Sequence, residues 1–373
     1  MHSRQYLCWT ENGAEQRAVW RSLSKAPAPG KTVVVDDRVS ADSAFRMASQ
    51  GTAMLWRGDF PNARQLLQAM TRRVDRRRRK PASSPTDAFH RHRQAQAQRA
   101  RILGMLLVPF GPDHTIPLLR APDVWHACSE AYGADAEPGV GPLRELLGAI
   151  SAHEWHRKGV PVPALEGRVH PRYGVFSPSR SEYVDLVAQL PLPSRRSAFD
   201  IGTGTGVLAA VLARRGVGTV VATDDSPRAA ECARENLARL APAQRTQVLE
   251  TPLFPPGRAS LVVCNPPWIP AKPTTPLEHA IYDPEHRMLH GFLNGLAAHL
   301  EPGGEGWLVL SDLAERLGLR SRAELLAAFD TAGLRLLDRH DTSPAHPRSA
   351  DTSDPLHAAR AAEVTSLWRL AAD

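Results

Sequence analysis

From residue 198 to the end of the chain, short apolar runs alternate with segments of helical period. The runs have the composition of strands and lie at 198–201, 219–223, 246–249, 261–264, 306–310, 334–338 and 364–370. Helical segments separate most of them, at 207–215, 228–240, 284–300 and 322–332. This alternation predicts a mostly parallel, doubly wound α/β sheet with right-handed crossovers. The run 246–249 is edge-like, and the last strand, which follows 334–338 without a crossover helix, should be antiparallel.

The chain is long enough for a second domain in front of this one. Its 373 residues could form two separate cores. The Gly- and Pro-rich segment 158–168 is typical of a hinge, so we expect domains at 1–168 and 169–373. Helical patterns at 60–74 and 87–107 and strand patterns at 32–35 and 106–110 predict an N-terminal α or α+β domain that is mainly helical.

The basic charge of the chain belongs to its N-terminal part. The net charge is +7, but residues 1–170 hold 25 Lys and Arg against 16 Asp and Glu, whereas residues 171–373 hold 21 against 23. Because only five of the 46 basic residues are lysine, a GC-biased genome explains some of the arginine excess. A basic N-terminal domain is compatible with a substrate-recognition role on RNA or on the ribosome. The run 72–80 (RRVDRRRRK) could bind phosphate or form a solvated helix end and loop.

Several classes of protein are not expected. No run reaches the length of about 18 apolar residues that spans a membrane, and the N-terminus lacks the apolar core of an export signal. The four cysteines are scattered, which argues against a disulfide framework and favours a reducing cytoplasm. His153 and His156 have no third ligand at metal-site spacing, so no metal is expected.

A glycine-rich turn, 202–206 (GTGTG), joins the strand 198–201 to the next helix. Glycines allow a tight turn and a close approach to a ligand, and the helix N-terminus behind them offers free N–H groups. Asp224 ends the next strand, where a carboxylate can accept both ribose hydroxyls. A dinucleotide fingerprint would need glycine at Val207, and Asp200 ahead of the turn suits a cationic amino group better than a pyrophosphate. S-adenosylmethionine is therefore favoured over NAD.

The run 260–264 ends in Asn265-Pro266-Pro267-Trp268. Two prolines fix two φ angles and remove two N–H donors, so the carbonyls of Asn265 and Pro266 are held in a defined direction. Asn265 adds an amide acceptor and Trp268 a flat apolar face. These groups suit a planar amide or amine, although the same four residues could be a simple Pro-rich turn after a core strand.

Together these motifs resemble class I S-adenosylmethionine-dependent methyltransferases, in particular the amino-methylating group with an (Asn/Asp/Ser)-Pro-Pro-(Tyr/Phe/Trp) motif. The continuation after Trp268, with Leu300-Glu301-Pro302-Gly303-Gly304, is similar to HemK/PrmC-type glutamine N5-methyltransferases. The resemblance covers about residues 171–373 and implies a Rossmann-like, seven-stranded methyltransferase domain.

The resemblance also implies roles for individual residues. Asp200 would face the methionine amino group, Asp224 would hold the ribose diol, and Asp225 would lie beside the adenine. The expected cofactor-binding residues are Asp200, Gly202, Thr203, Gly204, Thr205, Gly206, Asp224, Asp225 and Asn265. The expected catalytic residues are Asn265, Pro266, Pro267 and Trp268, and the expected substrate-binding residues are Phe176 and Trp268.

Two residues depart from the family pattern. Pro252 stands where relatives usually place an Asp that bonds the adenine amino group, so adenine recognition must differ. Trp268 replaces the commoner Tyr, which enlarges the platform and removes a hydroxyl.

The implied reaction is N-methylation of a planar amide or amine, and four alternatives for its target stay open. A protein glutamine is suggested by the similarity after Trp268. A nucleic-acid base, adenine N6 or guanine N2 of rRNA or tRNA, is suggested by the basic N-terminal part. A small-molecule amine is the third. The fourth is an inactive binding module of the same fold, against which the intact Asp200, Asp224 and Asn265 argue.

Overall fold

The computed structural model describes residues 4–76, 81–134, 137–178, 181–273, 276–343 and 351–373. The chain divides into two compact units. The N-terminal unit comprises Met1–Pro81 and His90–Glu154, and the C-terminal unit comprises Ala82–Phe89 and Trp155–Asp373. The sequence analysis places one boundary near residue 168, whereas the contacts divide the chain after Glu154 and add the upstream segment Ala82–Phe89 to the C-terminal unit. Part of the arginine run, 77–80, lies outside the described residues.

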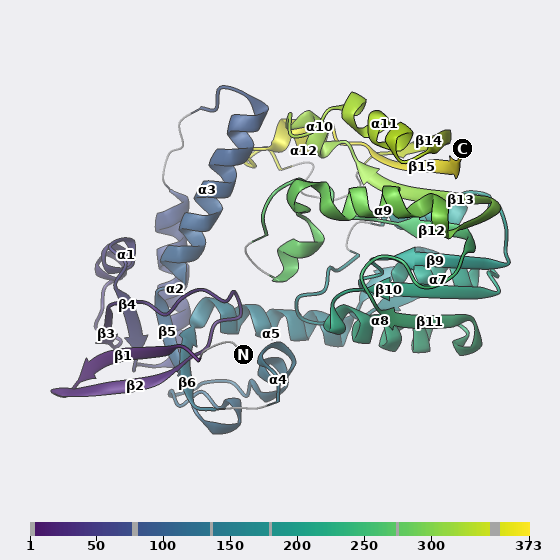
Figure 1. Ribbon diagram of the computed structural model, residues 1–373. Coiled ribbons are helices and arrows are strands. Elements are labelled where there is room, and N and C mark those ends of the chain that lie inside the picture. Colours follow the sequence, from purple (N-terminus) through teal and green to yellow (C-terminus); the bar gives the residue numbers. More distant parts are fainter. Residues whose placement is uncertain (1–3, 77–80, 135–136, 179–180, 274–275, 344–350) are drawn as a thin grey trace. The chain divides into compact units, whose positions relative to one another are not determined.

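The N-terminal unit is built on a six-stranded sheet with the order β1-β2-β6-β5-β4-β3 (Figure 1). Its strands are β1 Tyr6–Glu11, β2 Ala14–Trp20, β3 Thr32–Val35, β4 Ala53–Trp56, β5 Leu106–Phe110 and β6 Gly139–Pro142. Its helices are α1 Ala41–Ser49, α2 Phe60–Asp75, α4 Trp125–Tyr132 and most of α3 Pro85–Leu103 and α5 Leu143–Lys158. Of the two expected classes, α and α+β, the structure has the second. The expectation of a mainly helical domain did not include β1 and β2, which form an antiparallel pair at one edge of the sheet.

The C-terminal unit contains the seven-stranded sheet that the sequence predicts, with the order β11-β10-β9-β12-β13-β15-β14. The strands are β9 Ser197–Ile201, β10 Thr219–Asp224, β11 Thr246–Glu250, β12 Ala259–Cys264, β13 Leu300–Ser311, β14 Leu334–Thr342 and β15 Thr365–Ala372. The strand β11 lies at one edge, and β15 is antiparallel to both β13 and β14. Both expectations are confirmed. A short hairpin of β7 Val160–Val162 and β8 Gly167–Val169 precedes this sheet.

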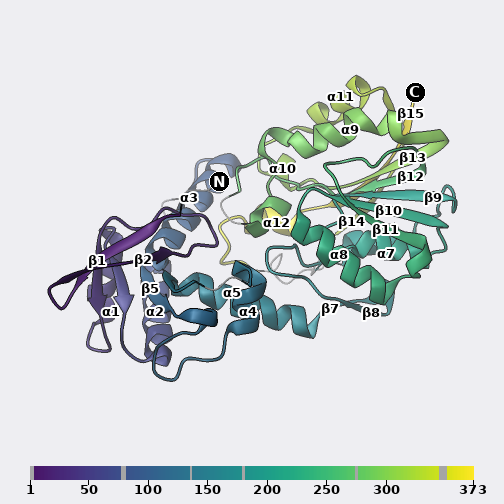
Figure 2. The same ribbon diagram turned by 60° about the horizontal axis from the view of Figure 1, so that its bottom comes forward.

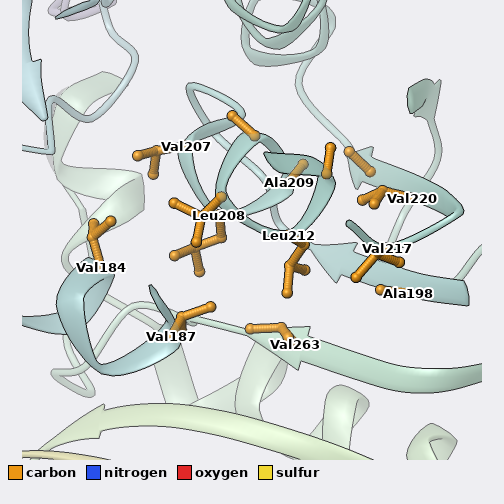
Figure 3. Packing of buried hydrophobic residues seen from close by; sticks show 14 of the residues in the cluster. Val184, Val187, Ala198, Val207, Leu208, Ala209, Leu212, Val217, Val220 and Val263 are labelled. Atoms are coloured by element: carbon orange, nitrogen blue, oxygen red, sulfur yellow. The ribbon is translucent and has the colours of Figure 1, made fainter. Parts of the chain in front are cut away.

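Helices cover both faces of the seven-stranded sheet (Figure 2). The helices of this unit are α6 Glu182–Gln189, α7 Val207–Arg214, α8 Pro227–Leu240, α9 Arg287–His299, α10 Leu313–Arg316, α11 Arg322–Thr331 and α12 His357–Ala361. Within β12, Leu261 and Val263 belong to the core with α6 and α7, whereas Val262 and Cys264 belong to the core with α9 and α11. Figure 3 shows Val263 opposite Val187 and Leu212 in the first of these cores. Burial on both faces explains why this strand is uniformly apolar.

A segment from far upstream completes the C-terminal unit. Thr86, near the start of α3, donates a hydrogen bond from its hydroxyl to the Leu317 carbonyl at 2.8 Å. Phe89 is 3% exposed and lies in a buried cluster with Ile269, Leu313, Leu317 and Leu356. Trp268 packs against the same cluster. The first turns of α3 therefore support the segment that carries the Asn-Pro-Pro-Trp motif.

The described residues contain no helix long and apolar enough to cross a membrane. A search of the same residues finds no cluster of three or more His, Cys, Asp or Glu side chains that could hold a metal ion. All four cysteines are free, and Cys128, Cys232 and Cys264 are buried.

We expect Phe89→Ala to destabilise the C-terminal unit by about 3–5 kcal/mol, the usual loss when a buried phenylalanine leaves a cavity. Hydrogen–deuterium exchange should show faster exchange in α10 and around Ile269. The matched control is Phe45→Ala, because Phe45 packs in the core of the N-terminal unit. If Phe89→Ala speeds exchange only in the N-terminal unit, the assignment of this segment is wrong.

Candidate active site

Three neighbouring strands of the C-terminal unit end at nearly the same level, and each has a predicted site residue at its last position or directly after it. Ile201 of β9 is in register with Thr223 of β10 on one side and with Cys264 of β12 on the other, and both pairings are parallel. The next residues along the three strands are Gly202, Asp224 and Asn265. The carboxyl edge of a parallel sheet is where open α/β folds bind ligands. The strand register therefore brings the glycine-rich turn, the acidic residue and the Asn-Pro-Pro-Trp motif together.

The glycine-rich turn adopts a backbone that other residues rarely accept. Gly202, Gly204 and Gly206 have φ values of +69°, +56° and +80°. A Cβ added at Gly206 would lie 3.2 Å from the Cα of Ala233, and one at Gly202 would meet the Met288 methyl group. At Gly204 no described atom lies within 4 Å of such a Cβ. Gly204 is thus the position of the turn that borders open space, where a ligand could approach the backbone.

Asp200 stabilises this turn through hydrogen bonds to its carboxylate. Its carboxylate accepts a hydrogen bond from the Thr203 hydroxyl at 2.6 Å and one from the Ala209 N–H at 3.0 Å. The side chain is 1% exposed, and burial raises its pKa from 3.8 to about 6, although the two hydrogen bonds act in the opposite direction. The described hydrogen bonds of Asp200 are therefore with the turn and with the start of α7, and a contact with a methionine amino group stays a prediction.

Asp224 is tied to the same turn. One carboxylate oxygen accepts the Gly204 N–H at 3.0 Å, and the other accepts the Ser226 N–H at 3.0 Å. Burial raises the pKa of Asp224, whose carboxylate remains partly accessible, while Asp225 is exposed. Each carboxylate oxygen has a second lone pair, so Asp224 keeps acceptor capacity for a diol.

The Asn-Pro-Pro-Trp motif is held by an internal hydrogen bond that sequence analysis does not predict. The Trp268 indole N–H donates to the Asn265 amide oxygen at 2.8 Å. Pro266 is buried, and the other three residues of the motif are half-buried. One of the two acceptor positions of the Asn265 oxygen is therefore occupied by the protein.

The backbone after Trp268 is fixed at Ile269. The Ile269 N–H donates to the Ile281 carbonyl at 3.2 Å, and the Asp283 N–H donates to the Ile269 carbonyl at 2.9 Å. The buried Asp283 carboxylate accepts the N–H groups of Met288 and Leu289 at the start of α9. Asp283 and Met288 thus link the Asn-Pro-Pro-Trp segment to α9 and to Gly202. Sequence analysis missed both residues, because the link depends on a loop closed in space.

Asn236 is a second residue that sequence analysis missed. It is fully buried in α8, and its amide nitrogen donates to the Thr205 carbonyl at 3.0 Å. Its amide oxygen accepts the His170 N–H at 2.9 Å. Asn236 therefore joins the glycine-rich turn to the segment 170–178 that carries Phe176. A polar residue within the apolar helix pattern is the only sequence signal for this role.

The remaining predicted residues are less closely tied to the three strand ends. Phe176 is half-buried in a loop whose Val175 packs on Ala229 and Cys232. Pro252 is exposed, and Leu253 beside it has φ +56° while its carbonyl accepts the Thr223 hydroxyl. The loop after β11 is therefore shaped by backbone contacts, and Pro252 itself offers no side-chain acceptor.

Asp200→Asn should stabilise the unliganded protein at pH 7. Between pH 3.8 and about 6 the folded state binds more protons than the unfolded chain, so this group lowers the free energy of unfolding as pH rises. The shift to about 6 corresponds to at most about 3 kcal/mol at neutral pH. Urea unfolding at pH 4 and pH 7 checks this, with a gain expected mainly at pH 7. The control Asp225→Asn should change stability little at either pH, and an equal loss at both pH values for Asp200→Asn would contradict the prediction.

Comparisons with known proteins find similarity in the same part of the chain. Residues 166–321 match the family model described as methyltransferase small domain. A release factor glutamine methyltransferase of Cereibacter sphaeroides is 35% identical over 122 residues, which are 29% of this chain and 44% of that protein. A ribosomal protein L11 methyltransferase of Pelotomaculum thermopropionicum is 34% identical over 148 residues, which are 39% of this chain and 40% of that protein. The chain thus spans less than half the length of these two relatives.

A crystal structure of a ribosomal protein L11 methylase from Lactobacillus delbrueckii subsp. bulgaricus aligns with 56% of this chain and 87% of that chain. The sequence identity is 17% and the TM-score is 0.38. The family match covers β9, β10, β11, β12 and β13 with the three strand ends, whereas β14 and β15 lie beyond it. Residues 166–321 of this chain are therefore similar to the methyltransferase small domain family.

Proposed function

We infer that this chain is an S-adenosylmethionine-dependent N-methyltransferase that acts on a primary amide, with a glutamine side chain of a protein as its substrate. The observation that carries the proposal is the common level of β10, β9 and β12, which sets Asp224, Gly202 and Asn265 side by side. This arrangement gives one edge of the sheet both a place for the methyl donor and a pair of acceptors for an NH2 group.

The donor half of the proposal rests on the glycine-rich turn. Gly204 borders open space, and the partly accessible Asp224 keeps acceptor capacity for the ribose hydroxyls of S-adenosylmethionine. The methionine part of the cofactor would then lie along Gly202 and Gly204. Asp200, below the turn, supplies negative charge near the cationic sulfonium and amino groups once its carboxylate is ionised.

The acceptor half rests on Asn265 and Pro266. The free lone pair of the Asn265 amide oxygen and the Pro266 carbonyl offer one acceptor to each N–H of a primary amide. These bonds draw electron density back to a nitrogen whose lone pair is delocalised, and they stabilise its pyramidal form in the transition state. The nitrogen then bonds the methyl carbon, the carbon–sulfur bond breaks with its electron pair on sulfur, and the cationic nitrogen loses a proton to water. Holding the two reactants in line supplies the proximity effect.

The relatives support a protein substrate. Two curated relatives are named release factor glutamine methyltransferase, and they are 35% and 36% identical to this chain over 122 and 124 residues. Since other relatives are named ribosomal protein L11 methyltransferase, the name of the substrate protein differs among them. We propose a release factor as the substrate, because the acceptor pair at Asn265 and Pro266 matches the NH2 of a glutamine amide.

The substrate class can be tested in a lysate from a strain that lacks this protein. With methyl-labelled S-adenosylmethionine and the purified chain, label should enter the protein fraction, and mass spectrometry should find methylglutamine in a release factor. Label in RNA would instead favour methylation of a base, in line with the basic residues 1–170. Label in neither protein nor RNA would contradict both substrates.

Asn265→Ala should lower the rate of methyl transfer by about 10²–10³-fold, the usual effect of removing one preorganised hydrogen-bonding group from a transition state. Calorimetry should show S-adenosylmethionine binding within about threefold of the wild type, because the loss falls on the chemical step. Asp224→Ala is the converse variant and should weaken cofactor binding. If Asn265→Ala methylates at the wild-type rate, the proposed role of Asn265 is wrong.

A comparison of Gly204→Ala with Gly206→Ala should distinguish a loss of space for the cofactor from a loss of packing within the protein. Gly204→Ala should reduce stability by about 1 kcal/mol, because alanine is strained at a positive φ, but it should weaken cofactor binding at least tenfold by filling the open space. Gly206→Ala should reduce stability more, since its Cβ also meets the Ala233 backbone. Thermal unfolding and calorimetry on both variants check this, and unchanged cofactor affinity in Gly204→Ala would exclude the turn as the binding site.

A further inference from the structure

The hydrogen bond within the Asn-Pro-Pro-Trp motif joins two side chains that the proposed mechanism treats separately. The Trp268 indole N–H donates to the Asn265 amide oxygen at 2.8 Å. An indole has only this one donor and no acceptor, so its partner must be an oxygen or another acceptor. The bond therefore fixes which end of the Asn265 carboxamide faces Trp268.

Fixing the carboxamide matters because its two ends have opposite chemistry. The oxygen accepts hydrogen bonds, whereas the NH2 group donates two, and the terminal torsion of asparagine has two broad wells of similar shape. In the flipped orientation, the Asn265 NH2 would meet the N–H groups of the substrate, and no hydrogen bond could form. An asparagine free to flip would thus be inactive for part of the time.

Trp268 is held firmly enough to impose the orientation. Its ring packs against the two cores on opposite faces of the sheet and against the cluster that contains Phe89 and Ile269. The backbone that follows it is fixed by the hydrogen bonds of Ile269 to Ile281 and of Asp283 to Ile269. The indole N–H is therefore a donor whose position is fixed by packing and by the backbone that follows it.

We propose that Trp268 is a positioning residue, whose indole N–H locks the Asn265 carboxamide with its oxygen available to the substrate amide. The inference rests on the proposed function and deepens it, because it explains what tryptophan contributes at this position beyond an apolar face. One lone pair of the Asn265 oxygen is used by Trp268 and the other accepts a single substrate N–H. With the Pro266 carbonyl, the site then accepts two N–H groups, the number that a primary amide carries.

The first test needs neither substrate nor cofactor. In the unliganded protein labelled with ¹⁵N-tryptophan, the Trp268 indole proton should exchange slowly with solvent. Asn265→Leu removes the acceptor at similar size and should speed this exchange at least tenfold. The matched variant Asn265→Asp keeps an oxygen acceptor and should preserve the protection. Equal exchange in the wild type and in Asn265→Leu would overturn the inference.

The second test measures methyl transfer to a bacterial release factor. Replacement of Trp268 by benzothienylalanine, which exchanges the ring N–H for sulfur at nearly the same shape, should lower kcat about tenfold. The KM for the release factor and the affinity for S-adenosylmethionine should stay within about twofold, which a loss of folding would not produce. Trp268→Phe should lower kcat at least as much, and the same isostere at the exposed Trp125 should leave kcat unchanged.

The outcomes separate the two proposals. An unchanged kcat with benzothienylalanine at Trp268 would overturn the positioning role, and a higher kcat would show instead that the indole N–H competes with the substrate. A wild-type protein that transfers no methyl group to any fraction of a lysate would overturn the proposed function and this inference with it. In that case the exchange measurement would still report whether the hydrogen bond exists.

Discussion

The register of the central strands is the constraint on which the site depends. Because β9 pairs in parallel with both β10 and β12, the residues that follow Thr223, Ile201 and Cys264 must emerge at one level of one edge. A shift of one residue in either pairing would turn the affected strand over and exchange its two buried faces. The apolar residues of β12 divide between two cores, so such a shift would be resisted by packing on both sides. Site geometry and core packing are thus set by the same pairings.

The sequence predicted the C-terminal sheet well because its central strands β9, β12 and β13 are largely apolar and buried, and because helices of clear period separate most of the strands. The seven runs and the antiparallel last strand follow from local pattern alone. The N-terminal sheet was harder, since β1 has one buried residue and β2 has none. The contribution of Phe89 could not be predicted, because it depends on packing against residues about 180 to 270 positions later in the chain.

In the candidate site, too, local sequence patterns were predictive, whereas contacts between distant segments were not. Motif spacing was sufficient to select Asp200, Asp224 and Asn265. The partners of these side chains were not predictable, since hydrogen bonds depend on rotamers and on segments that meet only in the folded chain. The Trp268 bond to Asn265 and the Asn236 bond to Thr205 are of this kind. The two internal hydrogen bonds of Asp200 and its raised pKa were likewise not predicted.

The division of α3 between the two units limits how the N-terminal domain could be exchanged during evolution. Its first residues, Pro85–Phe89, are counted with the C-terminal unit, while the rest of the helix belongs to the N-terminal unit. A recombination event that joined a new front domain at residue 166, where the family match begins, would leave Phe89 behind and open the cluster beside Trp268. The C-terminal unit is therefore not a single stretch of the sequence. A different N-terminal domain could replace this one only if it supplied the same short segment, or if the cluster beside Trp268 were repacked.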